Sequence, residues 1–350
     1  MSPSNQPLTR SLVIAPQWIG DAVMTEPLMR RLQARGERLT VGALPWVAPV
    51  YRAMPQVAQV IEFPFAHGGL QFRARRTLAQ ALDGQFDVAY VLPNSLKSAL
   101  LPLLAGIPKR IGYLGETRVG LLTHRLKNPP KHQRPPMVAF YSRLSGAAED
   151  DLALDRPHLQ LKAEAVQATL ARFGLQQGGY TVCAPGAEYG PAKRWPGRHV
   201  ATLAVGLEGL VLLLGSAKEA AECEAIAAPV NALHPDKCLN LAGKTTLIEA
   251  FALISASRHV VSNDSGLMHV AAAFEVPQVA IFGSSSPIHT PPLSPKAHVV
   301  WLKNDTSYQP PLDCAPCFER ECPLPPGPSH LRCLEDVSPK NVAKLLLAVP

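Results

Sequence analysis

The sequence predicts an α/β protein of two domains, each built around an open parallel β-sheet. Short β-rich runs alternate with helical patterns, and the alternation starts again after a polar, Asp-rich connection at Glu149–Pro157. The 350 residues, of which 47% are hydrophobic, suffice for two domains of ordinary size with a core each. The predicted division is residues 1–160 and 161–335, followed by a C-terminal helix at 336–350.

Strands and helices alternate through the first half of the chain. The expected strands are Ser11–Pro16, Leu39–Leu44, Gln59–Ile61, Val88–Leu92 and Arg110–Gly112. The expected helices are Asp21–Arg35, Phe72–Asp83, Ser95–Ala105 and Met137–Ser145. Helices placed between strands carry the chain back across the sheet, so this order predicts parallel strands.

The second half repeats the pattern after a helix at Ala163–Phe173. The expected strands are Tyr180–Ala184, Leu210–Leu214, His259–Ser262, Val276–Phe282 and His298–Trp301. The last stretch, Ser338–Val349, has its apolar residues on one side and predicts an amphipathic helix.

The charge balance narrows the classes of partner. A net charge of +7 favours nucleic acid or an anionic lipid surface. No nucleic-acid-binding motif accompanies the charge, and several basic clusters lie in the first half, so an acidic acceptor or a membrane surface is favoured; a solvated face explains part of this charge. The polar segment Met1–Arg10 and the lack of a long apolar run predict a cytoplasmic protein without a membrane span.

The segment from Val260 to Ala273 is the most informative, because a β-branched strand runs into a small polar turn that opens an Ala-rich helix. Free N–H groups at a helix start favour an anion, and a phosphate is the usual one. The next strand ends in Gly283-Ser284-Ser285-Ser286, so two strand ends are expected to share one site. Helix capping by Asp264 and Ser265 explains the same residues without a ligand.

Four segments, read together and in this order, carry a resemblance. They are IAPQWIGDAVM at 14–24, APGAEYGPAKRWP at 184–196, NDSGLMH at 263–269 and residues 283–290. Together they resemble glycosyltransferase family 9, the lipopolysaccharide heptosyltransferases, and its type II members most. The resemblance spans Ser11 to about Lys344. It implies the GT-B fold, in which two Rossmann-like domains face each other across a cleft that holds the active site. It also implies that the C-terminal helix, residues 336–350, packs back toward the first domain.

The resemblance implies inverting, metal-independent transfer of L-glycero-D-manno-heptose from ADP-heptose to the first heptose of the lipid A-linked inner core. It also implies work at the cytoplasmic face of the inner membrane, with peripheral attachment and without nucleic acid. Two alternatives stay open: a type I enzyme or another core transferase of the family, and a basic zinc-bearing nucleic-acid-binding protein.

Donor binding is expected in the second domain. By resemblance, Lys193 binds phosphate and takes part in catalysis, Glu219 binds the ribose, Asp264 contacts the heptose and His269 holds the turn. The diphosphate would also meet Ser265, Gly266, Ser284 and Ser285. From the residues alone, a surface lysine is the better explanation of Lys193, and a buried structural histidine explains His269 at least as well.

Asp21 is the expected catalytic base, because its place after Gly20 matches the family's catalytic aspartate. A helix-capping role explains the same residue. Acceptor binding is expected in the first domain, where Lys97 and Ser95 open a helix after a strand. The further candidates there are Arg110 and Arg118, which solvated surface positions explain as well.

The chain has no Asp-x-Asp motif, so no catalytic metal is expected. Four cysteines cluster near the C-terminus, at Cys314, Cys317, Cys322 and Cys333, and His330 lies close by. A structural zinc site is one interpretation of four such thiols, although their spacing differs from that of a zinc ribbon. Related type II enzymes have a similar loop without a metal requirement, and here a Pro-rich insertion precedes His330.

Overall fold

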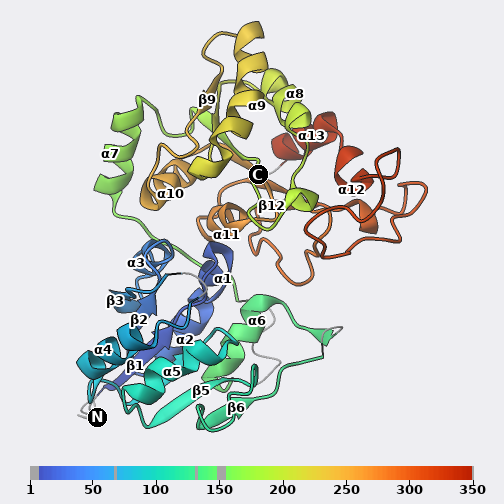
Figure 1. The fold of residues 1–350 in the computed structure, drawn as a ribbon. Helices are drawn as coiled ribbons and strands as arrows, with labels where there is room; N and C mark the ends of the chain where they lie inside the picture. The colour runs from blue at the N-terminus through green and yellow to red at the C-terminus, as the bar shows by residue number, and fades with distance from the viewer. Residues whose placement is uncertain (1–7, 67–68, 131–132, 148–154, 349–350) are drawn as a thin grey trace, which may run out of the picture. The chain divides into compact units, whose positions relative to one another are not determined.

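The computed structural model describes residues 8–66, 69–130, 133–147 and 155–348. The chain forms two compact units, Met1–Gln160 and Leu161–Pro350 (Figure 1). Each unit contains one six-stranded sheet whose strands all pair in parallel. The predicted α/β class with two Rossmann-like domains is confirmed. Most of the expected connection Glu149–Pro157 lies outside the described residues.

The first sheet has the strand order β3-β2-β1-β4-β5-β6. The chain therefore builds outward from β1 to β3 and then returns to the other side of β1 with β4. The elements are β1 (Thr9–Ile14), α1 (Ile19–Met24), α2 (Glu26–Ala34), β2 (Glu37–Ala43), α3 (Ala48–Arg52), β3 (Val57–Glu62), α4 (Phe72–Leu82), β4 (Val88–Val91), α5 (Leu96–Leu104), β5 (Lys109–Tyr113), β6 (His124–Leu126) and α6 (Met137–Ser142). In such a sheet, ligands bind at the carboxyl ends of the two strands where the order reverses, here β1 and β4.

One predicted helix of this unit is two helices in the structure. The expected helix Asp21–Arg35 is divided at Thr25, whose hydroxyl donates to Ala22 O at 2.6 Å. Pro27 then stands in the first turn of α2, where its missing N–H costs no helical hydrogen bond. The Pro27 position was the signal in the sequence that a new helix begins there.

Helices cover both faces of the first sheet. α4 and α5 pack together on one face, and α2 packs against α6 on the other. The core beneath α4 and α5 joins strand residues such as Leu12 and Ala89 to helix residues such as Leu82 and Leu101. β4 (Val88–Val91) and the second half of β1 (Leu12–Ile14) are buried and read as continuous apolar runs, which made them easy to predict.

The second sheet repeats this topology, with the strand order β12-β11-β10-β7-β8-β9. Here the order reverses between β7 and β10. The elements are α7 (Ala163–Phe173), β7 (Tyr180–Ala184), α8 (Gly197–Gly206), β8 (Leu210–Leu213), α9 (Ala220–Leu233), β9 (Cys238–Asn240), α10 (Leu247–Ser255), β10 (His259–Asn263), α11 (Gly266–Ala273), β11 (Gln278–Ile281), β12 (Ala297–Val300), α12 (Arg332–Glu335) and α13 (Pro339–Ala348).

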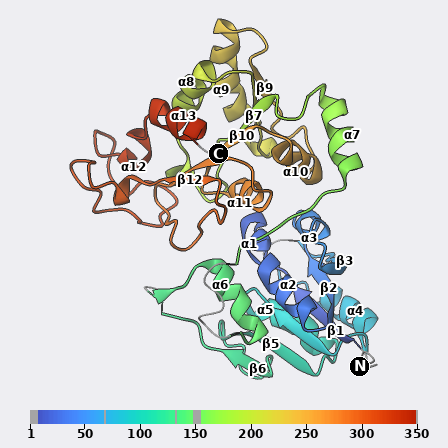
Figure 2. The same cartoon turned by 180° about the vertical axis from the view of Figure 1, so that it is seen from behind.

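Two groups of helices cover the second sheet. α8, α9 and α13 lie on one side, and α7, α10 and α11 lie on the other, as both ribbon views show (Figures 1 and 2). Val342 and Leu346 of α13 are fully buried in the core formed with α8 and α9. The apolar side of α13 therefore packs in the core of the second unit. The expected packing of this helix toward the first domain stays a prediction.

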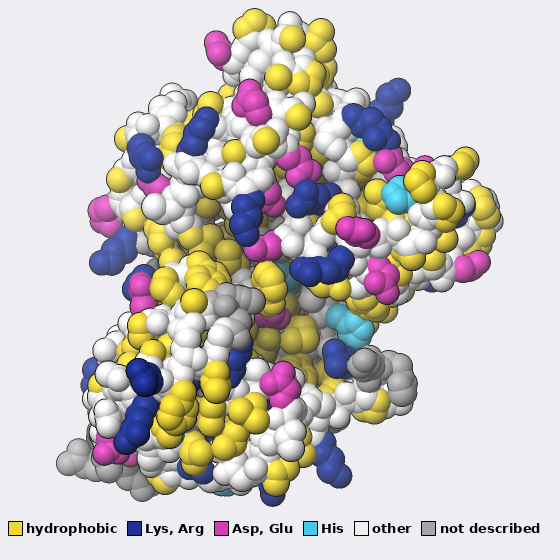
Figure 3. Space-filling model, viewed as in Figure 1, with side chains coloured by type: hydrophobic (Ala, Val, Ile, Leu, Met, Phe, Trp, Pro, Cys, Tyr) yellow, Lys and Arg dark blue, Asp and Glu magenta, His cyan; other side chains and the backbone are white. Residues whose placement is uncertain are grey.

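The surface shows how the charge is distributed. On the face drawn in Figure 3, Lys and Arg side chains are interspersed with Asp and Glu side chains over both units. Within the residues that the structure describes, no helix has the length and the apolar character that crossing a bilayer requires.

Candidate functional site

Lys193 and Asp264 meet at the point where the order of the second sheet reverses. Lys193 ends a single 3-10 turn (Pro191–Lys193) in the connection after β7, and Asp264 directly follows β10. The ammonium Nζ lies 2.6 Å from Asp264 Oδ2, and both side chains are largely buried. Thr290 Oγ1 donates to the other carboxylate oxygen at 3.2 Å. The pair therefore forms at the edge where such folds bind their ligands.

Asn263 fixes the two loops that carry this pair. Its Nδ2 donates to Pro185 O at 2.5 Å, and its Oδ1 accepts from the backbone N–H of Trp195 at 3.0 Å. The indole of Trp195 is itself buried in the core and donates to Val337 O at 3.0 Å. The connection that contains Lys193 is thus held at both ends.

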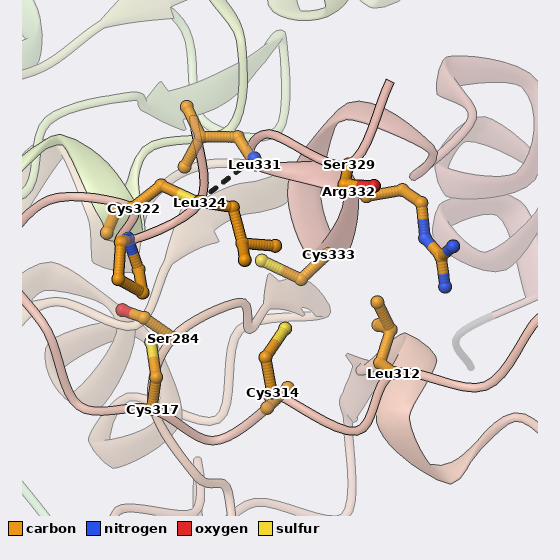
Figure 4. A pocket seen from close by; sticks show the side chains of 13 residues that line it. Ser284, Leu312, Cys314, Cys317, Cys322, Leu324, Ser329, Leu331, Arg332 and Cys333 are labelled. Atoms are coloured by element: carbon orange, nitrogen blue, oxygen red, sulfur yellow. Dashed lines mark hydrogen bonds between the residues drawn. The ribbon is translucent and has the colours of Figure 1, made fainter. Parts of the chain in front are cut away.

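Three serine hydroxyls near this edge are buried without a hydrogen-bond partner in the described part of the chain. They belong to Ser265, Ser284 and Ser285. Buried hydroxyls normally find a partner, so each unpaired one is a candidate for a ligand contact. Ser265 starts α11, whose first N–H groups are also available to an anion. Ser284 differs from the other two, because its side chain lines a small cavity among cysteines (Figure 4).

Glu219 lies at the same edge, after β8. Its Oε2 accepts from the N–H and the hydroxyl of Ser216 at 2.7 and 2.9 Å in a capping box. A Cβ on Gly186, which follows β7, would come within 1.7 Å of Glu219 Oε1. The carboxylate therefore occupies the space beside β7 that the missing side chain leaves open.

His269 is buried inside α11, one turn beyond the helix start. Burial lowers its pKa to about 4, against a smaller opposing effect of the Asp264 charge. The ring is therefore neutral at physiological pH. This agrees with a residue that shapes the turn and supplies no charge to a ligand.

The first unit has a hollow of about 540 Å³ at its own reversal point. It is lined by the segments that follow β1 and β4, with contributions from Glu116 and α6. Asp21 lines it from the first turn of α1, and Ser95 and Lys97 line it from the start of α5. The structure thus brings the expected base together with two of the expected acceptor residues.

Two buried tyrosines surround Asp21. The Tyr141 hydroxyl hydrogen-bonds to the Asp21 carboxylate, and Tyr51, which is hydrogen-bonded to Thr25 Oγ1 at 3.1 Å, lies nearby. Burial, with a further effect of the Asp21 charge, raises the pKa of Tyr141 well above its ordinary value. Tyr141 is therefore a neutral phenol that keeps its proton and donates a hydrogen bond to the carboxylate.

The two expected acceptor arginines have structural partners. Arg118 is fully buried and donates to Pro93 O at 2.7 Å and to Asn94 Oδ1 at 3.1 Å. It holds the turn that lines the hollow. Arg110 lies at the amino end of β5, away from the reversal edge, and donates to Leu121 O and Ile107 O. Neither is among the lining residues of the hollow.

The four clustered cysteines surround a cavity of about 20 Å³ (Figure 4). All are free thiols, and Cys322 Sγ accepts from the N–H of Leu331 at 3.3 Å. Burial, and then the three neighbouring thiols, raise the pKa of Cys333 to about 12. Over the described residues, no three His, Cys, Asp or Glu side chains are grouped as a metal ion requires.

Thr290 and Tyr141 were not expected at these sites. Thr290 is the last residue of the segment 283–290, one of the four that carry the family resemblance. Its place in the connection after β11 was the signal that could have identified it as a site residue. Tyr141 is 120 positions from Asp21 and carries no local signal, because α6 reaches the carboxylate only through tertiary packing.

The chain is similar to known proteins in both sequence and fold. Residues 75–326 match glycosyltransferase family 9 (heptosyltransferase). The chain is 45% identical over 305 residues to lipopolysaccharide heptosyltransferase 2 of Escherichia coli (strain K12), covering 83% of this chain and 87% of the relative. It is 40% identical to lipooligosaccharide heptosyltransferase 2 of Haemophilus influenzae, covering 83% and 88%. The solved structure of E. coli ADP-heptose lps heptosyltransferase II superposes with a TM-score of 0.82 at 39% identity, covering 97% of this chain and 98% of that one.

Proposed function

The chain belongs to glycosyltransferase family 9, and from this premise we propose that it transfers L-glycero-D-manno-heptose from ADP-heptose to the first heptose of the lipopolysaccharide inner core. The predicted family is confirmed, and the protein is a glycosyltransferase of lipopolysaccharide biosynthesis. The observation that carries the finer proposal is the Lys193–Asp264 pair beside unpaired serine hydroxyls at one sheet edge.

The donor site is proposed at this edge. The Lys193 ammonium would bind a diphosphate oxygen, because a charge-assisted hydrogen bond is the strongest neutral-pH contact a lysine offers. The hydroxyls of Ser265 and Ser285 and the N–H groups at Gly266 would complete an anion site, and Glu219 would bind the ribose hydroxyls. Asp264 would turn from Lys193 to the sugar.

A metal is not required in this proposal. The leaving diphosphate would be neutralised by Lys193 and by the helix start of α11, which supply positive charge without a cation. The lack of an Asp-x-Asp motif in the sequence supports the same view.

The acceptor site is proposed in the hollow of the first unit. Asp21 would take the proton of the acceptor hydroxyl while its oxygen bonds to the anomeric carbon, as the bond from that carbon to the diphosphate breaks and ADP leaves. Attack opposite the leaving group inverts the anomeric centre. Tyr141 supports this role by holding the carboxylate, and Ser95 and Lys97 would contact the acceptor.

The proposed acceptor is attached to lipid A, so the enzyme would work at the cytoplasmic face of the inner membrane as a peripheral protein. The net charge of +7 supports attraction to an anionic lipid surface.

One experiment tests the function. Purified protein is incubated with ADP-heptose and lipid A-linked acceptors that carry either no heptose or one heptose, and ADP release is followed. Release only with the one-heptose acceptor is the expected result. Release only with the acceptor lacking heptose would indicate a type I enzyme, and no release with either would contradict the proposal.

A further inference from the structure

The cysteine-rich segment, residues 314–333, contacts both loops of the donor edge. Phe318 donates its N–H to Ser284 O at 2.7 Å, and the Tyr189 hydroxyl donates to Phe318 O at 2.7 Å. The segment is thereby joined to the loop after β11 and to the loop after β7. A segment with no catalytic assignment of its own is thus part of the donor edge.

Arg320 contacts the loop that carries Lys193 through both its backbone and its side chain. Its carbonyl accepts from the N–H of Ala192 at 3.0 Å, and its Nε donates to Tyr189 O at 2.7 Å. A Cβ at Gly190 would lie 2.3 Å from Arg320 O, so only glycine permits this approach. Backbone and side chain both fix Arg320 against the loop that carries Lys193.

Arg320 and Lys193 place their cations on the same ring. The guanidinium carbon of Arg320 lies 5.2 Å from the centroid of Tyr189, and Lys193 Nζ lies 5.3 Å from it. Lys193 has Asp264 as its counter-charge. Within the part of the chain that the structure describes, no carboxylate lies in ion-pair distance of Arg320. Arg320 is thus a second cation beside the Tyr189 ring, in addition to Lys193 of the Lys193–Asp264 pair.

We propose that Arg320 is a second donor-binding cation, whose guanidinium binds the diphosphate of the nucleotide sugar together with Lys193. The inference rests on the proposed function and extends it to the cysteine-rich segment. Nε is engaged by Tyr189 O, which orients the planar group and leaves its terminal N–H groups for phosphate oxygens. The cysteine-rich segment then serves to present Arg320 to the donor.

The test measures binding of ADP and of adenosine by calorimetry to the full-length protein and to Arg320→Ala. We expect ADP to bind roughly 10- to 100-fold more weakly, the range for losing a hydrogen bond between charged groups. Adenosine, which lacks phosphates, should bind with unchanged affinity. Arg320→Gln retains the length and polarity without the charge and should give the same loss.

The matched control is Arg332→Ala. Arg332 belongs to the same segment, and its guanidinium also lies 5.2 Å from a tyrosine ring, that of Tyr308, but it donates to Pro310 O and Pro311 O and not to the Lys193 loop. It should bind ADP as the wild type does. If the wild type binds ADP and Arg320→Gln binds it with the same affinity, the inference alone is overturned. Failure of the wild type to bind ADP would overturn the proposed function and the inference with it.

Discussion

Lys193 Nζ lies 2.6 Å from Asp264 Oδ2, although 71 positions separate the two residues in the sequence. The contact exists because β7 and β10 are neighbours in the sheet while two strands and three helices intervene along the chain. A buried ion pair is stable only while both partners are present. A ligand that binds the Lys193 ammonium must therefore also donate hydrogen bonds to the Asp264 carboxylate. The hydroxyls of a sugar would do so.

Lys193→Ala should weaken ADP binding and turnover together, because the lost ammonium would contact the diphosphate both in the bound complex and in the transition state. The expected loss of binding is about 1.5–3 kcal/mol. Calorimetry with ADP and initial-rate measurements check it. Lys218→Ala, at an 87% exposed lysine after β8, is the matched control and should change neither quantity. Unaltered ADP affinity in Lys193→Ala would contradict the donor role.

Asp21→Asn should retain binding of ADP-heptose and lose most turnover, because an amide cannot accept the acceptor's proton. A general base contributes roughly 10²- to 10⁴-fold. Single-turnover rates with the acceptor present measure the loss. Asp87→Asn, which removes a surface ion pair with Arg10, should leave the rate unchanged. A fall of less than about threefold would remove Asp21 from the proposed mechanism.

Tyr141→Phe should lower kcat by about 2- to 10-fold with little change in KM for either substrate, since one neutral hydrogen bond to the base is lost. The role is positioning, because Tyr141 acts through Asp21. Tyr113→Phe is the control, because Tyr113 is also buried and its hydroxyl donates to α6 at Phe140 O. Equal losses of kcat in both variants would indicate a general effect on α6.

Glu26 should make stability depend on pH. Its side chain is fully buried, and burial raises its pKa to about 7 despite the opposing Arg30. Because the folded protein holds this proton more tightly than the unfolded chain, the stabilisation is complete below about pH 4.5 and is lost as pH rises through about 7. The amplitude is about 3 kcal/mol at most.

Glu26→Gln should therefore melt at a more constant temperature between pH 5 and pH 8 than the wild type. Gln56 donates to Glu26 at 2.9 Å, and its own Oε1 is buried without a partner, so a turned Gln56 amide can accept from the new amide. Thermal melts at several pH values measure the difference. Parallel pH dependence in both proteins would contradict the assignment to Glu26.

Activity should not depend on a divalent metal, because Lys193 and the start of α11 would neutralise the diphosphate. Initial rates measured in EDTA and after addition of magnesium are expected to agree. A rate that collapses in EDTA and returns with magnesium would overturn the metal-independent mechanism.

Local sequence signals determined the elements that are long or fully buried. β7 (Tyr180–Ala184) and α7 (Ala163–Phe173) have the predicted bounds, because a buried apolar run and a 3.6-residue period are local properties. The three-residue strands β6 and β9 were not predicted, since so short a run acquires strand geometry only from the neighbour it pairs with.

The same division applies to the site. Asp21, Lys193 and Asp264 follow predicted strands, so the sequence alone determined which loops carry polar groups at the carboxyl ends of the sheets. Only the tertiary structure decided which side chains meet: Lys193 with Asp264, Tyr141 with Asp21, and Arg320 with Tyr189. It also assigned Arg118 to the interior. Strand order and loop packing bring together residues 71 to 131 positions apart, and no local pattern in the chain encodes such distances.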